Sequence, residues 1–438
     1  MPLINSNESG IDSGSEWLGN VPFSWSMVLL SQVVSQVKNK NSDLSEKNLL
    51  SLSYGKIKRK PIDTTEGLLP ASFDGYNIIE ANDIVLRLTD LQNDHTSLRV
   101  GISTEKGIIT SAYITMRPKN SKTAKFLYYL LHTFDVRKGF YGMGSGVRQG
   151  LNYGEVKRLK IPFPAEDEQV AIANFLDNEI MRVDSIISEA KASIEEYKCW
   201  KASIIYEAVT KGLDLSVEMK DSGVEWIGDI PNSWDVLKLK YVIAFIESGV
   251  SVNASQSAAG EGKIGVLKTS SVSKYSFRPE ENKEVNLDEL GRVSCPVRAN
   301  TIIVSRMNTP ELVGACGYVE QDYPNLFLPD RLWQVHFLNS VVVKYIWYYL
   351  SSNYIRNYYS SLSSGTSSSM QNISKGQFEN ARLLLPPPEV QRDIVEFLDK
   401  KCATLDSLVA EKESLIADLE AYKKSLIFEV VTGKRRVV

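Results

Sequence analysis

The sequence is poor in the side chains that metal sites and nucleophilic enzymes use. Its 438 residues include only 4 cysteines and 3 histidines. The histidines are too scattered along the chain for a catalytic triad or a metal site with a recognisable spacing. The cysteines form no CxxC pair, so neither a disulfide framework nor a zinc site is expected, and a reducing cytoplasm fits. These residues are His95, His132 and His336, and Cys199, Cys295, Cys316 and Cys402.

Long apolar runs and catalytic motifs are also missing. No run of 18 or more apolar residues is present, so no membrane span is expected. The first ten residues have neither a basic start nor an apolar core, which argues against a secretion signal. There is no GxxxxGK[ST] and no HExxH. The glycine-rich stretch 142–146 opens no predicted helix and is a weak dinucleotide site; a structural turn and a DNA-contacting loop remain equally good interpretations. We expect a binding protein without catalytic residues, metal or cofactor of its own.

What the sequence does contain is a pair of long helical patterns. From Asp167 to Val209, apolar or small residues recur at alternating steps of three and four, without an interrupting glycine or proline. This is the seam of a coiled coil. A second copy from Glu389 to Val431 lies 222 residues later and repeats the Phe-Leu-Asp triplet. Because one amphipathic helix needs a partner, we expect the two to pair. The predicted interface is Leu176, Ile180, Val183, Ile187, Ile194, Leu398, Leu405, Val409, Ile416 and Leu419.

A second repeat is a tryptophan-rich box. Residues 12–25 (DSGSEWLGNVPFSW) and 221–234 (DSGVEWIGDIPNSW) are identical at nine of fourteen positions. Such a long-range match indicates an internal duplication. We interpret the tryptophans as packing residues rather than base-stacking ones. The second box follows the first helix, so the first box occupies the place that would follow the second helix. The plan closes on itself, which favours antiparallel helices and a pseudo-twofold arrangement.

Two globular segments complete the predicted organisation. Residues 77–87 and 107–117 each predict a turn into a buried strand, and residues 123–131 predict a helix with an aromatic face. The fold class is therefore α+β, with two similar globular domains separated by two long antiparallel helices that form a coiled coil. The predicted segments are a box at 1–25, a domain at 26–164, a helix at 165–212, a linker and box at 213–234, a domain at 235–388, and a helix with a tail at 389–438.

Charge is distributed unevenly between these segments. The chain as a whole carries a net charge of −3. Residues 26–164, however, hold 20 Lys and Arg against 12 Asp and Glu, and residues 235–388 hold 15 against 13. The helical stretches are acidic, most strongly at 165–220. A basic globular part joined to an acidic spacer is the layout expected when the globular part binds phosphates.

Residue types that bind DNA occur in both globular segments. In the first, the segment YGKIKRKP supplies cations suited to phosphates, although a solvated loop is as good an interpretation for each one. Arginine, glutamine and asparagine at strand ends and in loops are types that bind base edges. The candidates are Lys56, Lys58, Arg59, Lys60, Arg87, Arg117, Arg148, Gln149 and Asn152 in the first segment, and Arg306, Asn308, Arg331, Gln371 and Asn372 in the second.

The two boxes, the helix entries IPFPAEDEQVAIANFLD and LLPPPEVQRDIVEFLD, and the two long helices together resemble the specificity subunit of type I restriction-modification systems. The resemblance covers essentially the whole chain. It implies two target-recognition domains, each for one half of a bipartite asymmetric DNA site, and a helix pair that sets the spacer and docks two methylation subunits. Motor-nuclease restriction subunits would join them. S-adenosylmethionine, ATP and magnesium would belong to those partners. The second segment departs from the pattern in its small positive charge.

Two other functions remain open from the residues. The chain could be a coiled-coil scaffold that binds proteins and has no DNA role, although the basic first segment disfavours this. It could also be the specificity subunit of a methylation-only system that has no nuclease partner. The sequence does not separate that alternative from full restriction.

Overall fold

The computed structural model describes residues 10–63, 70, 72–94, 96–143, 150–214, 216–224, 227–367 and 370–437. The chain divides into two compact units. Unit 1 consists of residues 1–191 and 413–438, and unit 2 consists of residues 192–412. This division cuts both long helices, so each unit contains one part of α4 (Glu166–Lys211) and one part of α8 (Pro388–Val431). Among the described residues, no helix combines the length and the apolar content needed to cross a membrane.

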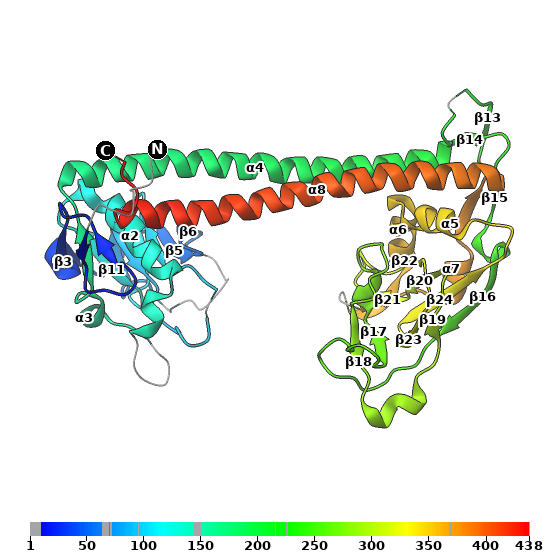
Figure 1. Cartoon of the computed structure of the whole chain (residues 1–438), viewed down its shortest axis with the longest axis horizontal. Helices are drawn as coiled ribbons and strands as arrows, with labels where there is room; N and C mark the ends of the chain where they lie inside the picture. Colours follow the sequence, from blue (N-terminus) through cyan, green and yellow to red (C-terminus); the bar gives the residue numbers. More distant parts are fainter. Residues whose placement is uncertain are drawn as a thin grey trace. The chain divides into compact units, whose positions relative to one another are not determined.

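Unit 1 is built around two four-stranded sheets, with strand orders β6-β5-β10-β7 and β4-β11-β8-β9 (Figure 1). Helix α2 contributes Phe126, Leu127, Leu130 and Leu131 to the core, all of them fully buried. The elements are β1 (Ile11–Asp12), β2 (Asn20–Val21), β3 (Ser26–Leu29), α1 (Leu30–Val33), β4 (Val34–Gln36), β5 (Leu49–Ser53), β6 (Lys56–Lys60), β7 (Asn77–Ile79), β8 (Ile84–Leu86), β9 (Val100–Ile102), β10 (Gly107–Ile109), β11 (Ile114–Pro118), η1 (Ser121–Thr123), α2 (Ala124–Val136), η2 (Gly139–Gly142), α3 (Tyr153–Val156) and β12 (Lys160–Phe163).

Unit 2 repeats the topology of these two four-stranded sheets. Its sheets have the orders β18-β17-β23-β19 and β16-β24-β20-β22, and each unit has one parallel pair at the same place, β5 with β10 and β17 with β23. The elements are β13 (Met219–Asp221), β14 (Asp229–Pro231), β15 (Asp235–Lys238), η3 (Leu239–Tyr241), β16 (Ile243–Ser248), β17 (Gly265–Leu267), η4 (Thr269–Val272), β18 (Asn282–Glu284), η5 (Leu287–Arg292), β19 (Pro296–Val297), β20 (Thr301–Ser305), β21 (Met307–Asn308), β22 (Cys316–Val319), β23 (Tyr323–Phe327), β24 (Leu332–Phe337), α5 (Val343–Ser351), α6 (Asn353–Leu362), β25 (Ser364–Ser367), β26 (Met370–Asn372), α7 (Lys375–Glu379) and β27 (Arg382–Leu385).

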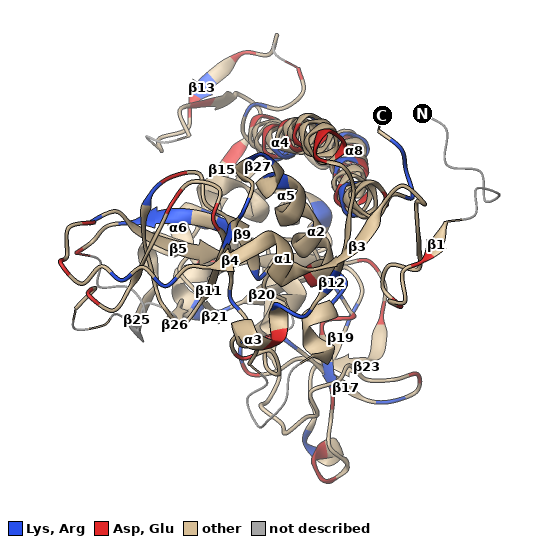
Figure 2. Cartoon of the chain, turned by 90° about the vertical axis from the view of Figure 1, so that its left-hand side faces the viewer, with Lys and Arg blue, Asp and Glu red and all other residues tan. Residues whose placement is uncertain are grey.

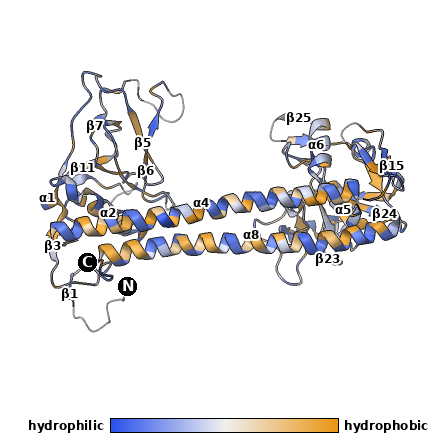
Figure 3. Cartoon of the chain, turned by 90° about the horizontal axis from the view of Figure 1, so that it is seen from above, coloured by the Kyte–Doolittle hydropathy of each residue, from blue (hydrophilic) through white to orange (hydrophobic). Residues whose placement is uncertain are grey.

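The helices are antiparallel within each unit. In unit 1 the beginning of α4 packs with the end of α8, since Leu176 shares a core with Leu426 and Val430. In unit 2 the end of α4 packs with the beginning of α8, since Val209 shares a core with Leu398. Hydropathy alternates along both helices, as coiled-coil packing requires (Figure 3). The predicted α+β class and the antiparallel helices are confirmed in each unit. The equal sheet topology of the two units confirms the internal repeat.

The repeated Phe-Leu-Asp triplet has a direct structural role. Asp177 accepts a hydrogen bond from the hydroxyl of Tyr129 at 2.6 Å, and Asp399 accepts the equivalent bond from Tyr348 at 2.7 Å. Lys125 and Lys344 form ion pairs with the same two carboxylates. Asp177 thus attaches α4 to α2 in unit 1, and Asp399 attaches α8 to α5 in unit 2. This shared contact explains why the motif occurs twice.

The tryptophan boxes close the ends of the long helices. Helix α4 is followed by Gly212 at φ +75°, where an added Cβ would lie 3.2 Å from the ring of Trp234. Helix α8 is followed by Gly433 at φ +74°, where a Cβ would lie 2.4 Å from Pro22. Only glycine adopts this conformation without strain. The first box therefore does occupy the position after the second helix.

Most expected elements appear, with one correction. Trp25 and Trp234 are buried, which confirms packing as their role, whereas Trp226 lies outside the described residues. The segments 77–87 and 107–117 each contain the expected buried strand, β8 and β11, but each also contains an earlier strand, β7 or β10, that was not predicted. Each segment contains two short strands that belong to different sheets, because turns at Asn82 (φ +74°) and at 110–113 redirect the chain. The predicted helix at 123–131 is part of α2 and runs five residues further.

Burial of His132 on α2 leads to a pH-dependent prediction. Desolvation, aided by Lys423 of α8, lowers the pKa of His132 to about 4. Its folded pKa lies below the unfolded value, so the stability that it contributes is present above about pH 6.5 and is lost as the pH falls towards 4. We expect an NMR titration to give a pKa near 4, with the resonance assigned by its loss in His132→Gln. The unfolding free energy of His132→Gln should fall less steeply between pH 6.5 and 4 than that of the parent. A pKa near 6.5 would contradict the packing of α8 against α2.

Candidate nucleic-acid interface

A face of three lysines runs along β6 at the edge of its sheet. Lys56, Lys58 and Lys60 occupy alternate positions of the strand and are all exposed. Side chains alternate across a strand, so the three lie on one face, while Ile57 turns the other way and packs on the core of the sheet. Three ammonium groups spaced along an extended strand match a row of phosphates. Lysines on an edge strand also discourage pairing with other chains.

Arg59 is separated from this lysine face by its contacts. It lies between Lys58 and Lys60 and donates from Nε to Glu105 at 2.8 Å. The hydrogen bond to Glu105 raises the pKa of Arg59, and the same bond lowers the pKa of Glu105. The Arg59 side chain remains 72% exposed. The sequence grouped Arg59 with the three lysines, but the structure engages it in an ion pair on the opposite face.

The remaining candidates of unit 1 fall into two groups. Leu151 donates from its backbone to Leu88 at 2.9 Å, which brings the segments that contain Asn152 and Arg87 together. Arg117 instead lies on β11 in a two-pronged ion pair with Asp83, with both contacts at 2.7 Å, and this hydrogen bonding raises its pKa. Because Asp83 is 1% exposed, Arg117 is engaged in neutralising a buried carboxylate. Arg148 and Gln149 lie outside the described residues.

In unit 2 the structure brings the candidates together. Strand β21 pairs with β26 so that Asn308 lies opposite Gln371, and Met307 lies opposite Asn372. The backbone of Arg306 donates to Arg331 at 3.1 Å and accepts from Ile373 at 3.0 Å. With β25, these strands form a small three-stranded sheet that carries the amides of Asn308, Gln371 and Asn372, and the backbone of Arg306 joins this sheet to Arg331. Such groups bind the edges of bases bidentately.

The two sites occupy equivalent places in the two units. The bond between Leu151 and Leu88 in unit 1 corresponds to the bond between Ile373 and Arg306 in unit 2. Each is followed by a short helix with a capping box, Asn152 with Glu155 at α3 and Ser374 with Gln377 at α7. The framework is the same, while the loops that it holds differ in length and composition. This is the arrangement expected of two recognition domains with different specificities.

The helix pair has a buried seam along most of the predicted positions. Leu176, Val183, Ile187, Ile194, Leu398 and Leu405 are buried, whereas Ile180, Val409, Ile416 and Leu419 are half-buried. Ion pairs flank the seam within each unit, Asp184 with Lys423 at 2.6 Å in unit 1 and Lys201 with Asp406 at 2.7 Å in unit 2. Both signs of charge occur along α4 and α8 (Figure 2). Acidic and basic side chains therefore pair along the helices instead of forming a cationic surface.

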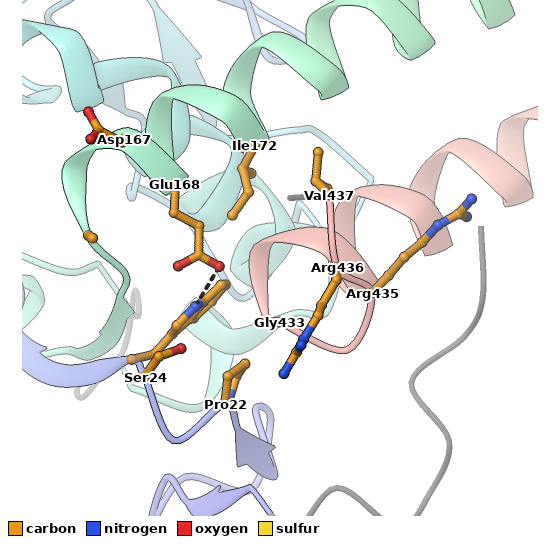
Figure 4. Close-up of a pocket in the computed structure, with 11 residues that line it drawn as sticks. Pro22, Ser24, Asp167, Glu168, Ile172, Gly433, Arg435, Arg436 and Val437 are labelled. Carbon is orange, nitrogen blue, oxygen red and sulfur yellow. Dashed lines mark hydrogen bonds between the residues drawn. The ribbon is translucent and has the colours of Figure 1, made fainter.

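The described residues of each unit line a cavity. In unit 1, a cavity of about 500 Å³ lies where the first box meets the start of α4 and the residues after α8. Trp25 donates from Nε1 to Glu168 at 3.0 Å, and the dashed line that ends at Glu168 in Figure 4 marks this bond. In unit 2, a cavity of about 1010 Å³ is lined by aromatic side chains that include Trp347 and Tyr318. Neither holds a histidine, and the described residues contain no cluster of three metal-ligating side chains.

Comparison with known proteins identifies a family that matches this chain. The family model for the type I restriction modification DNA specificity domain matches twice, at residues 24–196 and 231–416. The chain belongs to this family. It is 25% identical over 432 residues to the MjaVIII type I restriction enzyme specificity subunit of Methanocaldococcus jannaschii, covering 95% of this chain and 94% of that one. It is 23% identical over 301 residues to the EcoKI specificity subunit of Escherichia coli.

Solved structures agree with the fold. A chain from a structural study of complex assembly and conformational transition in a type I R-M system has a TM-score of 0.66 at 15% identity, covering 95% of this chain and 100% of that chain. The HsdS subunit from Thermoanaerobacter tengcongensis has a TM-score of 0.50 at 15% identity, with 95% of this chain and 98% of that chain covered. The likeness at this identity is one of fold.

Sequence reasoning missed Arg99, which the structure places at the centre of the unit 1 site. Its side chain is 0% exposed and donates to the backbone of residues 87–94. One signal was available, because a charged residue in the apolar segment LRVGI breaks the pattern of a buried strand. Buried charges require partners, and such a residue indicates a specific local arrangement.

The lysine face of β6 gives a prediction about salt dependence. Replacing Lys56, Lys58 and Lys60 together with Gln should weaken DNA binding by the assembled complex at every sequence alike. The slope of log affinity against log salt should become shallower by about 3, one for each lost phosphate contact. Fluorescence anisotropy between low and physiological salt measures the slope. The matched control replaces three exposed lysines elsewhere in unit 1, Lys119, Lys160 and Lys191, with Gln. Equal slopes for the two triple variants would contradict the assignment of the lysine face.

Proposed function

We propose that this chain is the DNA specificity subunit of a type I restriction-modification complex. Each unit contacts one half of a bipartite asymmetric site, and the helix pair sets the gap between the halves. The observation that carries this proposal is the duplicated framework with unlike loops. Residues 87–94 and 150–152 in unit 1 occupy the place that residues 305–314, 364–367 and 370–373 occupy in unit 2. Two recognition domains that share one framework but carry different loops suit two different half-sites.

Two separate half-site contacts on one chain also explain how modest interfaces give specific binding. Once one unit is bound, the second half-site is presented at a high effective concentration, so the two affinities multiply. The basic charge of residues 26–164 supplies phosphate contacts that are independent of sequence. Residues 235–388 carry a smaller positive charge, so base contacts contribute a larger share of the DNA affinity in unit 2 than in unit 1.

Catalysis belongs to partner subunits in this proposal. The relatives are named specificity subunits of restriction enzymes, which supports a non-catalytic role within the complex. Two methylation subunits would carry S-adenosylmethionine, and motor-nuclease subunits would use ATP and magnesium. A cytoplasmic location is part of the same proposal and fits the free thiols of the four cysteines.

The outer surface of the helices supplies docking sites for the methylation subunits. In unit 1, Met181 is 70% exposed, and Ile186, Leu415 and Tyr422 are also exposed. In unit 2, Trp200 is 57% exposed on α4. These apolar side chains are available for contact with another protein that packs on the outer side of the helices. A scaffold without a DNA role is not favoured, because it leaves the duplicated loop sites unexplained.

The proposed spacer role predicts a change in the methylated motif. Inserting seven residues, one heptad, into both α4 and α8 keeps the seam in register and adds about 10 Å to the helix pair. The gap between half-sites should lengthen by about three base pairs, since base pairs are 3.4 Å apart. Single-molecule methylome sequencing in cells that carry the partner subunits measures the gap.

The half-site sequences should stay unchanged in that experiment. A seven-residue insertion into α4 alone serves as the control, because it displaces one seam against the other and should abolish methylation. If the double insertion methylates the parental motif with its original gap, the helix pair does not set the spacer. An uninterrupted palindrome as the parental motif would contradict the proposed function itself.

A further inference from the structure

The unit 1 site contains a fully buried arginine whose donors are all used. A guanidinium has five N–H groups in a fixed fork. In Arg99, Nε donates to the hydroxyl of Tyr141 at 3.0 Å. Nη1 donates to the carbonyls of Arg87 at 3.0 Å and Thr89 at 2.9 Å. Nη2 donates to the carbonyls of Asp90 at 3.3 Å and Asp94. Five donors therefore meet five acceptors in a site closed to solvent.

Four of these acceptors are backbone carbonyls of one short loop, residues 87–94. Because four carbonyls bind one guanidinium, the backbone path of the loop is fixed. Separate weak contacts would restrict the backbone less. Tyr141 also donates to the carbonyl of Asp94 at 2.9 Å, so the ring is a second attachment. Leu91 is 0% exposed and holds the middle of the loop against the core. Buried charge–dipole bonds of this kind are strong because little water competes for them.

The carbonyls that bind Arg99 point inward, whereas several polar side chains of the loop are exposed. Thr89, Gln92 and Asn93 are all exposed on the loop. Asn and Gln bind adenine in the major groove through paired hydrogen bonds, and Thr contacts bases of several kinds. The loop also lies against the segment that includes Asn152, through the bond from Leu151 to Leu88. It therefore lies beside the residues already proposed to contact DNA.

Unit 2 shapes the equivalent loop by different means. The backbone bond from Arg87 to Arg99 at 2.9 Å corresponds to the bond from Ser305 to Ala315 at 2.8 Å. Ala315 has no polar side chain, although it is as buried as Arg99. The loop after Ser305 instead pairs as β21 with β26. The arginine is thus specific to unit 1 and is not a requirement of the shared framework.

We propose that Arg99 is a positioning residue for base recognition by unit 1. It holds residues 87–94 in the shape that presents Thr89, Gln92 and Asn93 to the bases of one half-site. A loop already fixed in its bound shape loses less conformational entropy on binding, which strengthens discrimination between bases. This inference rests on the proposed function and adds to it a group of base-contacting residues and the side chain that orders them.

The test compares methylated motifs in cells that carry the chain with its partner subunits. Arg99→Lys offers three donors in place of five, so at least two acceptors lose their partner. Tyr141→Phe removes only the hydroxyl. We expect both variants to relax the base preference at one or more positions of one half-site, with the other half-site and the gap unchanged. Gln92→Ala and Asn93→Ala should relax that same half-site, whereas Asn308→Ala, in unit 2, should change the other one.

Controls separate positioning from general destabilisation. Asn178→Ala, at an exposed amide on α4, should leave the motif unchanged. A general loss of stability would lower methylation at all sites alike and leave the motif intact, and that result for Arg99→Lys would overturn the proposal. If Arg99→Lys fails to fold, Tyr141→Phe and Gln92→Ala decide, and an unaltered motif in both overturns it. A parental chain that yields no bipartite motif would instead refute the proposed function.

Discussion

The apolar seam of each long helix is the constraint on which the rest of the structure depends. An amphipathic helix of this length leaves a continuous apolar stripe in water unless a second helix covers it. Covering the stripe with an antiparallel helix places the start of one helix beside the end of the other in each unit. Each unit therefore contains one helix beginning and one helix end. The beginning carries the aspartate that meets the aromatic helix, and the end carries the glycine that the tryptophan box encloses.

The features that the sequence revealed were those with strong periodicity or repetition. The seam of α4 followed from the spacing of Leu176, Val183 and Ile187, and the duplication followed from two boxes and two helix entries. Strands of three residues were harder to predict. The segment 77–87 contains β7 and β8 in different sheets, yet its hydrophobic pattern is that of one strand. A turn at Asn82 with positive φ decides the outcome, and asparagine tolerates that conformation without demanding it.

The site was predictable by residue type but not by arrangement. Sequence offsets placed Asn308 and Gln371 in the same domain, and only the register of β21 with β26 places them opposite each other. Arg59 and Arg117 have the charge of DNA-binding residues, and tertiary contacts with Glu105 and Asp83 engage both of them. Arg99 is the converse case, since an isolated arginine in an apolar segment gives no indication of the four carbonyls that surround it.

The closure of the first box on the last helix has a consequence for synthesis. Unit 2 is one uninterrupted stretch, 192–412, whereas unit 1 joins residues 1–191 to residues 413–438. Lys434 reaches back to the carbonyl of Leu18 at 2.8 Å, across 416 positions of sequence. Domains fold as they leave the ribosome, beginning with the parts made first. Here the part made first must wait for the part made last, so the second unit completes its core while the first still exposes the surface that α8 will cover.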